Sequence, residues 1–135
     1  MTLVEIMVVM TLLGLLMTIL AVNFLGMAEN RKVDAALLQM ETIKGRLDAF
    51  KLEYSRYPST SEGLNSLVTP PQKSNGRTPA GYLDDANLLA DPWGNPLQYY
   101  APARTGDHPF EIVSLGSDGQ QGGEGTDMDI SNWQR

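Results

Sequence analysis

The chain begins with a long segment in which apolar residues would occupy every side of a helix. Residues 6–28 contain no charged side chain, and Glu5 is the only one before Glu29. At about 1.5 Å per residue, these 23 residues reach roughly 35 Å, enough to cross a hydrocarbon core of about 30 Å. The pattern predicts a membrane-spanning helix within residues 1–28.

From residue 29 onward, the apolar residues recur on one side of a helix only. They lie three or four positions apart, and charged residues fill much of the opposite side. The stripe consists of Val33, Leu37, Met40, Ile43, Leu47, Phe50 and Tyr54. It predicts an amphipathic helix that packs on a folded domain. We therefore expect one helix from about residue 3 to about residue 54, because nothing interrupts it; a coiled coil is the alternative.

The remainder has the pattern of a small antiparallel sheet. Pro58 ends the helix, because the residue before a proline avoids the α region, and a short helical turn then ends near Val68. Residues 69–81 indicate a loop, and residues 97–101 and 110–115 indicate two strands of a hairpin. The predicted fold class is α+β: a transmembrane helix over residues 1–28, and a head over residues 29–135 that includes the second half of the helix.

Composition limits the kinds of partner and chemistry. The chain has 135 residues, a net charge of −6 and no cysteine. The acidic balance argues against nucleic acid as a partner, and a bound metal is an alternative to disulfides for stabilising a small head. The single histidine, His108, is expected to be a solvated loop side chain. With no nucleophile–base pair or phosphate loop visible, we do not expect an enzyme.

Glu5 is the first candidate functional residue. A carboxylate beside an apolar helix costs a few kcal/mol in a bilayer, so we expect Glu5 to have a partner. The free α-amino group of Met1 is cationic near neutral pH and lies about one turn away. The two groups would neutralise each other within one chain, or between neighbouring subunits of a stack. A plain single-span anchor with an interfacial acid is the alternative.

The second candidate is an acidic loop near the C-terminus. Residues 116–132 combine glycines with four carboxylates: Asp118, Glu124, Asp127 and Asp129. Ca²⁺ takes about 6 to 8 oxygen ligands in flexible geometry, from carboxylates and backbone carbonyls. The loop therefore has the donors of a calcium site, although the EF-hand spacing is missing. A solvated, glycine-rich acidic tail is the alternative.

The N-terminal residues MTLVEIMVVMTLLG resemble the mature N-terminus of the type IV pilin and pseudopilin superfamily. In that superfamily a prepilin peptidase removes a leader and the new first residue is methylated. The family's acid matches Glu5 and its recurrent small residue matches Gly14. Met1 replaces the usual phenylalanine, and Val22 stands where many members have proline. The start of the chain within an apolar run is what removal of a leader would leave.

Four later stretches narrow the resemblance to the major pseudopilins of type II secretion: RYPSTSEGL, DPWGNPLQYY, SLGSDG and DISNW. The resemblance implies a subunit of a periplasmic homopolymer that helps to drive folded proteins across the outer membrane. Its implied partners are minor pseudopilins, an inner-membrane assembly platform, a prepilin peptidase and membrane lipid. Before assembly, a single span would anchor the subunit in the inner membrane, with its head in the periplasm.

The same resemblance implies one calcium ion per subunit. Its side-chain ligands would be Asp118, Asp127 and Asp129, with the backbone carbonyls of Leu115 and Gln120. Met128 separates two of these acids, so Glu124 is an alternative to Asp127. Two other functions remain open at this point: a type IV pilus subunit for adhesion or motility, and a membrane-tethered calcium-binding module that never polymerises.

Overall fold

The computed structural model describes residues 2–134, and it confirms one long helix followed by a small antiparallel sheet. The elements in chain order are the helices α1 (Leu3–Tyr54) and α2 (Asn65–Val68), the short helix η1 (Ala86–Leu89), the strands β1 (Gln98–Tyr100) and β2 (Glu111–Ser114), the short helix η2 (Gly125–Asp127), and the strand β3 (Ile130–Ser131). The chain divides into two compact units, one ending at Lys32 and the other beginning at Val33.

Helix α1 has the bounds that the sequence predicts, and it continues without a break through Val22. Valine keeps the backbone N–H that a proline would remove, so the hydrogen-bond ladder stays intact there. The helix ends where Ser55 adopts a φ of 58°. This left-handed conformation is a common way to terminate a helix, although glycine usually provides it.

The second half of α1 supplies one wall of the core of the second unit. Its fully buried residues, Ala36, Met40, Ile43, Leu47 and Phe50, follow spacings of four and three. Four of these five belong to the predicted stripe. The stripe's other three members, Val33, Leu37 and Tyr54, are partly buried against the same core.

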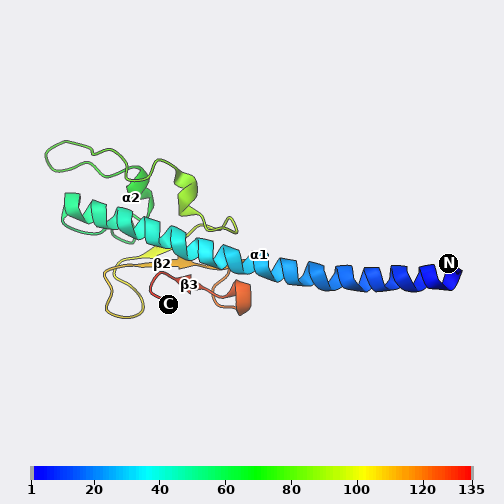
Figure 1. Ribbon diagram of the computed structural model, residues 1–135. Coiled ribbons are helices and arrows are strands. Elements are labelled where there is room, and N and C mark those ends of the chain that lie inside the picture. The colour runs from blue at the N-terminus through cyan, green and yellow to red at the C-terminus, as the bar shows by residue number, and fades with distance from the viewer. Residues whose placement is uncertain (1, 135) are drawn as a thin grey trace. The chain divides into compact units, whose positions relative to one another are not determined.

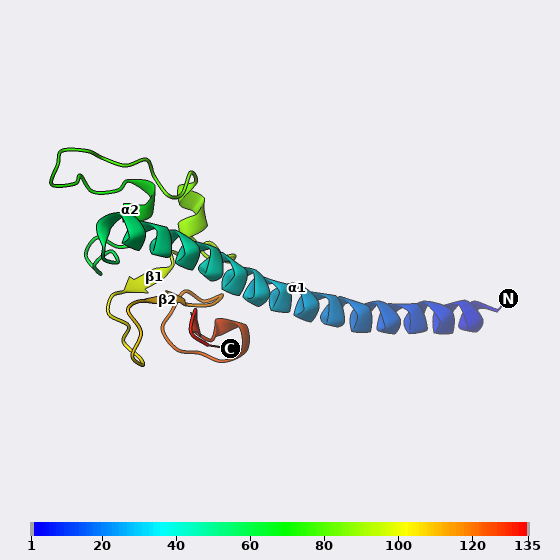
Figure 2. The same ribbon diagram turned by 60° about the vertical axis from the view of Figure 1, so that its left-hand side comes forward.

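The sheet has the strand order β1-β2-β3, and both pairs are antiparallel. Tyr99 of β1 lies opposite Ile112 of β2, and Val113 of β2 lies opposite Ser131 of β3. Figures 1 and 2 agree in placing the sheet on one side of the second half of α1, and α2 with η1 on the other. Apolar residues from both sides, including Leu67, Leu83 and Ile112, complete the core.

Three features differ from the sequence-based expectation. The helical turn after Pro58 ends at Val68 as predicted, but the helix itself begins only at Asn65. The short helix η1 lies in a stretch for which we expected no helix. Strand β3 has only two residues, too few to give a periodic pattern, and it pairs with β2 from the C-terminal end of the acidic loop.

Candidate functional site

The first half of α1 presents an apolar surface that no other part of residues 2–134 covers. Every large apolar side chain from Leu3 to Met27 is exposed, with exposed fractions from 42% to 80%. By length and composition α1 can cross a membrane, with a mean hydropathy of 2.5 over its most apolar stretch. This surface therefore requires an apolar environment outside the chain, such as lipid or other helices.

Two polar side chains within this segment are satisfied by the helix itself. The hydroxyl of Thr11 donates to the carbonyl of Met7 at 2.7 Å, and that of Thr18 donates to the carbonyl of Gly14 at 2.9 Å. Such bonds to the preceding turn spare both hydroxyls from facing an apolar environment unpaired. Glu5 remains as the ionisable group of the segment.

Glu5 lies in a capping box at the start of α1. The backbone N–H of Glu5 donates to Thr2 Oγ1 at 3.2 Å, and the N–H of Thr2 donates to Glu5 Oε2 at 3.4 Å. A threonine followed three positions later by glutamate is the sequence signature of this arrangement, and Glu5 therefore has a capping role that its predicted role in assembly did not include. The predicted partner, Met1, lies outside the described residues.

The turn before β1 is organised by a buried carboxylate. Asp91 Oδ1 accepts hydrogen bonds from the backbone N–H groups of Trp93 (3.1 Å) and Asn95 (2.8 Å). Its other oxygen accepts from the hydroxyl of Ser114 at 2.7 Å. The Asp-Pro-Trp-Gly-Asn turn is thereby attached to the end of β2, immediately before the acidic loop.

Asn95 extends this connection into the acidic loop itself. Its side-chain amide donates to the carbonyl of Gly116 at 3.0 Å. A Cβ at Gly119 would come within 2.9 Å of the Asn95 side-chain oxygen. Asp91 and Asn95 thus position the loop, a role that the sequence did not suggest because the two segments are more than 20 residues apart.

The acidic loop folds back on itself near the end of β2. The N–H of Ser117 donates to the carbonyl of Thr126 at 2.9 Å. Gly116 has a φ of 72°, and a Cβ there would come within 2.7 Å of the same carbonyl. Only glycine combines this backbone conformation with so close an approach. The two ends of the loop are therefore held together by backbone contacts.

Each predicted metal-binding carboxylate has a hydrogen-bond partner within the loop. Asp118 Oδ1 accepts from the N–H of Gln120 at 3.1 Å, and Asp127 Oδ1 accepts from the hydroxyl of Ser117. Asp129 Oδ2 accepts from the N–H of Gly122 at 3.0 Å. The second oxygen of Asp129, Oδ1, is buried without a hydrogen-bond partner.

Among residues 2–134, no three acidic, histidine or cysteine side chains converge closely enough to hold a metal ion. The loop nevertheless offers several carboxylate and carbonyl oxygens, the donors that Ca²⁺ prefers. A buried carboxylate oxygen without a partner is costly, and a cation is one group that would satisfy Asp129 Oδ1. Glu124 precedes η2, makes no side-chain capping bond and is exposed.

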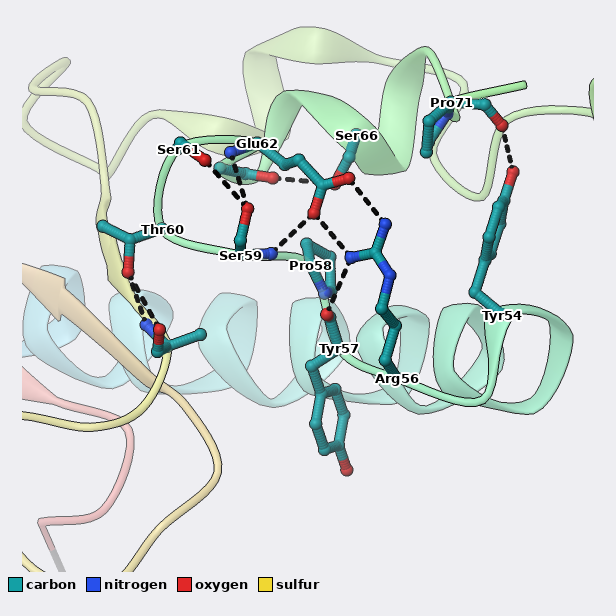
Figure 3. Close-up of polar contacts among 12 residues, drawn as sticks. Tyr54, Arg56, Tyr57, Pro58, Ser59, Thr60, Ser61, Glu62, Ser66 and Pro71 are labelled. Atoms are coloured by element: carbon teal, nitrogen blue, oxygen red, sulfur yellow. Dashed lines mark hydrogen bonds and ion pairs between the residues drawn. The ribbon is translucent and has the colours of Figure 1, made fainter. Parts of the chain in front are cut away.

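An ion pair and a second capping box organise the turn after α1 (Figure 3). Arg56 binds Glu62 through two bonds, Nη1–Oε2 at 2.6 Å and Nη2–Oε1 at 2.8 Å. The N–H of Ser59 donates to Glu62 Oε2 at 2.7 Å, and the N–H of Glu62 donates to Ser59 Oγ at 3.3 Å. The Arg56 hydrogen bond, opposed by burial and helped by the Ser59 donors, lowers the pKa of Glu62 from 4.5 to about 2.

The C-terminal segment docks on the sheet through Trp133. Its ring nitrogen donates to the carbonyl of Phe110 at 2.6 Å, and its ring stacks on His108 with centroids 4.0 Å apart. The Lys44 ammonium lies 4.9 Å from the Trp133 ring centroid. Trp133 therefore attaches the C-terminal segment to the sheet. The prediction of a solvated His108 is wrong, because its imidazole covers the tryptophan and is partly buried.

Comparisons with known proteins agree on one family. The model for type II secretion system protein G matches residues 23–133. The chain is 41% identical over 134 residues to a type II secretion system core protein G from Vibrio cholerae, covering 98% of this chain and 89% of that protein. It is 43% identical over 136 residues to its counterpart from Pseudomonas aeruginosa, covering 98% and 92%.

A solved structure of a major pseudopilin has a fold similar to that of this chain. The crystal structure of the major pseudopilin from the type 2 secretion system of enterohaemorrhagic Escherichia coli matches with a TM-score of 0.65 and 32% identity, covering 82% of this chain and 94% of that one. The residues matched by the family model, 23–133, include the Asp91 turn, the acidic loop and Trp133. The chain belongs to the type II secretion system protein G family, the major pseudopilins.

Proposed function

We propose that this chain polymerises into the periplasmic pseudopilus of type II secretion and that Glu5 guides its assembly. The uncovered apolar surface of residues 3–27 with Glu5 at its edge is the observation that carries the proposal. Lipid and a helix bundle are both apolar surroundings, so transfer of such a helix from one to the other gains little hydrophobic free energy. Close packing and polar pairing therefore decide the register between neighbouring helices. The role is structural, in keeping with a family of filament subunits.

The partner of Glu5 in this proposal is the cationic N-terminus of the neighbouring subunit. A prepilin peptidase would expose that amine by cleavage before Met1, and methylation would leave it charged. Within its own chain, Glu5 already accepts from the Thr2 N–H at 3.4 Å. This bond uses one lone pair of one carboxylate oxygen, so the group keeps acceptor capacity for a second cationic donor.

The proposed location follows from the span and the family. Residues 1–28 would anchor the subunit in the inner membrane before assembly, with residues 29–135 in the periplasm. Minor pseudopilins and the inner-membrane platform would be its partners in the filament, and lipid its surroundings before that. The net charge of −6 suits a head that must stay soluble until assembly.

We also propose that the acidic loop binds one Ca²⁺ through Asp118, Asp127, Asp129 and the carbonyls of Leu115 and Gln120. A divalent cation would remove the repulsion among these carboxylates and close the loop more tightly. The oxygen-only donor set and the partnerless Asp129 Oδ1 support this proposal. The ion would be structural, holding the segment that ends in Trp133 against the sheet.

The test of the Glu5 proposal separates charge from capping. Glu5→Gln keeps a side chain that serves in a capping box but removes the charge, whereas Thr2→Val removes the cap and keeps the charge. Full-length variants are coexpressed with the prepilin peptidase and the assembly machinery, and filaments are counted by electron microscopy. We expect Glu5→Gln to abolish filaments and Thr2→Val to retain them. Normal filaments from Glu5→Gln would contradict the pairing.

A further inference from the structure

The second half of α1 carries an apolar stripe on its outer side, in addition to the one that faces the core. This outer stripe consists of Ala35, Leu38, Thr42, Gly45, Ala49 and Leu52. Its members lie three or four positions apart, as on one face of a helix, and none is charged. Leu38 is 71% exposed and Leu52 is 88% exposed, the highest value among the large apolar side chains of residues 2–134.

One end of the outer stripe borders a preformed apolar groove. The groove has a volume of about 240 Å³ and lies between α1 and the segment that contains η1. Its apolar lining includes Ala35, Leu38, Leu83 and Leu88. The Gln39 side-chain amide donates to the carbonyls of Leu88 and Ala90, which fixes the outer wall of the groove on the helix.

The groove is suited to a single apolar side chain. Its volume lies below the roughly 300–1,000 Å³ of most small-molecule sites. Leu52 of the same chain cannot fill it, since 14 residues of helix separate Leu52 from Leu38, about 21 Å along the axis. An exposed apolar side chain and an apolar groove thus lie at two different places on one surface.

Identical subunits of net charge −6 repel one another, so contacts between copies favour uncharged surface. The outer stripe is an uncharged part of the exposed face of the second half of α1. An apolar side chain that fits a groove elsewhere on the same molecule makes a head-to-tail contact, and such contacts produce open helical filaments when they do not close into a ring. This is the kind of contact that a polymerising subunit needs.

We propose that Leu52 of one subunit packs into the Leu38–Leu88 groove of a second copy of this chain. The contact rests on the proposed polymerisation and adds to it a specific interface in the head. It is heterologous: each subunit offers Leu52 to one neighbour and its groove to another. Leu52→Ser should weaken subunit association by about tenfold or more, from the loss of one buried leucine.

The absence of cysteine from the chain permits a direct test by disulfide trapping. Filaments of the full-length Leu52→Cys/Leu88→Cys variant are oxidised and separated without reductant. We expect a ladder of covalent multimers from the double variant and monomers from each single variant. The matched control is Leu52→Cys/Ser74→Cys, since Ser74 is exposed and lies in the separate loop after Pro71; it should give no ladder.

Electron microscopy of the wild type and of each variant distinguishes a failure of the proposed polymerisation from a failure of the proposed Leu52 contact. If the wild type forms no filaments, the proposed function is wrong, and this contact with it. If filaments form but the double variant gives no ladder, the contact is wrong and polymerisation stands. Covalent dimers from Leu52→Cys alone would show a symmetric contact between two Leu52 residues and would also overturn the proposal.

Discussion

Asp91 Oδ2 accepts a hydrogen bond from the Ser114 hydroxyl at 2.7 Å, and both side chains are buried. The Ser114 oxygen in turn accepts from the N–H of Gly116 at 3.3 Å. One carboxylate therefore connects the turn before β1 to the first residue of the acidic loop. The relationship explains how two sequence motifs that are far apart in the chain come to act as one structural unit.

Asp91→Ala should destabilise the head by about 3 kcal/mol, because each buried donor left without an acceptor costs about 1–3 kcal/mol. Three donors lose their acceptor: the N–H groups of Trp93 and Asn95 and the Ser114 hydroxyl. Denaturant unfolding of the full chain in detergent, followed by tryptophan fluorescence, measures the change. The control Asp84→Ala alters an exposed carboxylate and should shift stability little; equal effects of both variants would contradict the role of Asp91.

Ser55→Gly should stabilise the second unit by about 0.5 kcal/mol. Ser55 has a φ of 58° at the end of α1, and a left-handed conformation costs a residue with a Cβ about 1–2 kcal/mol. Glycine removes that cost but loses about 0.5–1 kcal/mol of unfolded-state entropy. Ser55→Val serves as the opposite control, because a branched side chain tolerates positive φ poorly. The same unfolding assay should rank the three proteins Gly, Ser, Val in order of falling stability.

The sequence predicted the long elements well because their signals are periodic and local. The bounds of α1 followed from the uncharged run and the Val33-to-Tyr54 stripe, which extend over many turns. The strands around Tyr99 and Ile112 followed from short apolar runs between turn residues. In contrast, β3 has two residues, and its pairing with β2 depends on a loop that closes through backbone contacts.

The structure of the candidate site was harder to predict from the sequence. The acidic residues of the loop were visible, but the hydrogen bonds that Asp91 and Asn95 make to its first residues depend on tertiary contacts. His108 illustrates the same limit: its place between Asp107 and Pro109 suggested a solvated loop side chain, yet its ring stacks on that of Trp133, near the C-terminus. In contrast, the Thr2–Glu5 capping box is a local feature, and the threonine and glutamate three positions apart are enough to predict it from the sequence.

The Arg56–Glu62 ion pair should make stability depend on pH below about 4.5. The pKa of Glu62 falls from 4.5 to about 2 on folding. A carboxyl whose pKa is lower in the folded state contributes stability above its unfolded pKa and loses it as the pH falls toward its folded pKa. The contribution is therefore present at pH 7 and is lost between about pH 4.5 and pH 2.

Glu62→Gln isolates the charge, because glutamine keeps the bond to the Ser59 N–H in a capping box. The unfolding free energies of wild type and variant should differ at pH 7 and converge as the pH approaches 2. Glu124→Gln alters an exposed acid that forms no ion pair within residues 2–134, and it should show no such convergence. A difference between wild type and Glu62→Gln that stays constant with pH would contradict the assignment.

Calcium should stabilise the full chain against thermal unfolding, and a chelator should reverse the effect. A ligand that binds only the folded state at 100 times its dissociation constant adds about 2.7 kcal/mol. Asp118→Ala and Asp129→Asn should each abolish most of this gain, whereas Glu124→Ala should keep it if Asp127 is the ligand. Since Asp129 Oδ1 is buried without a partner, Asp129→Asn should also change stability without calcium. A melt of the wild type that does not respond to chelator would exclude the calcium site and leave the loop stabilised by Asp91, Asn95 and its own hydrogen bonds.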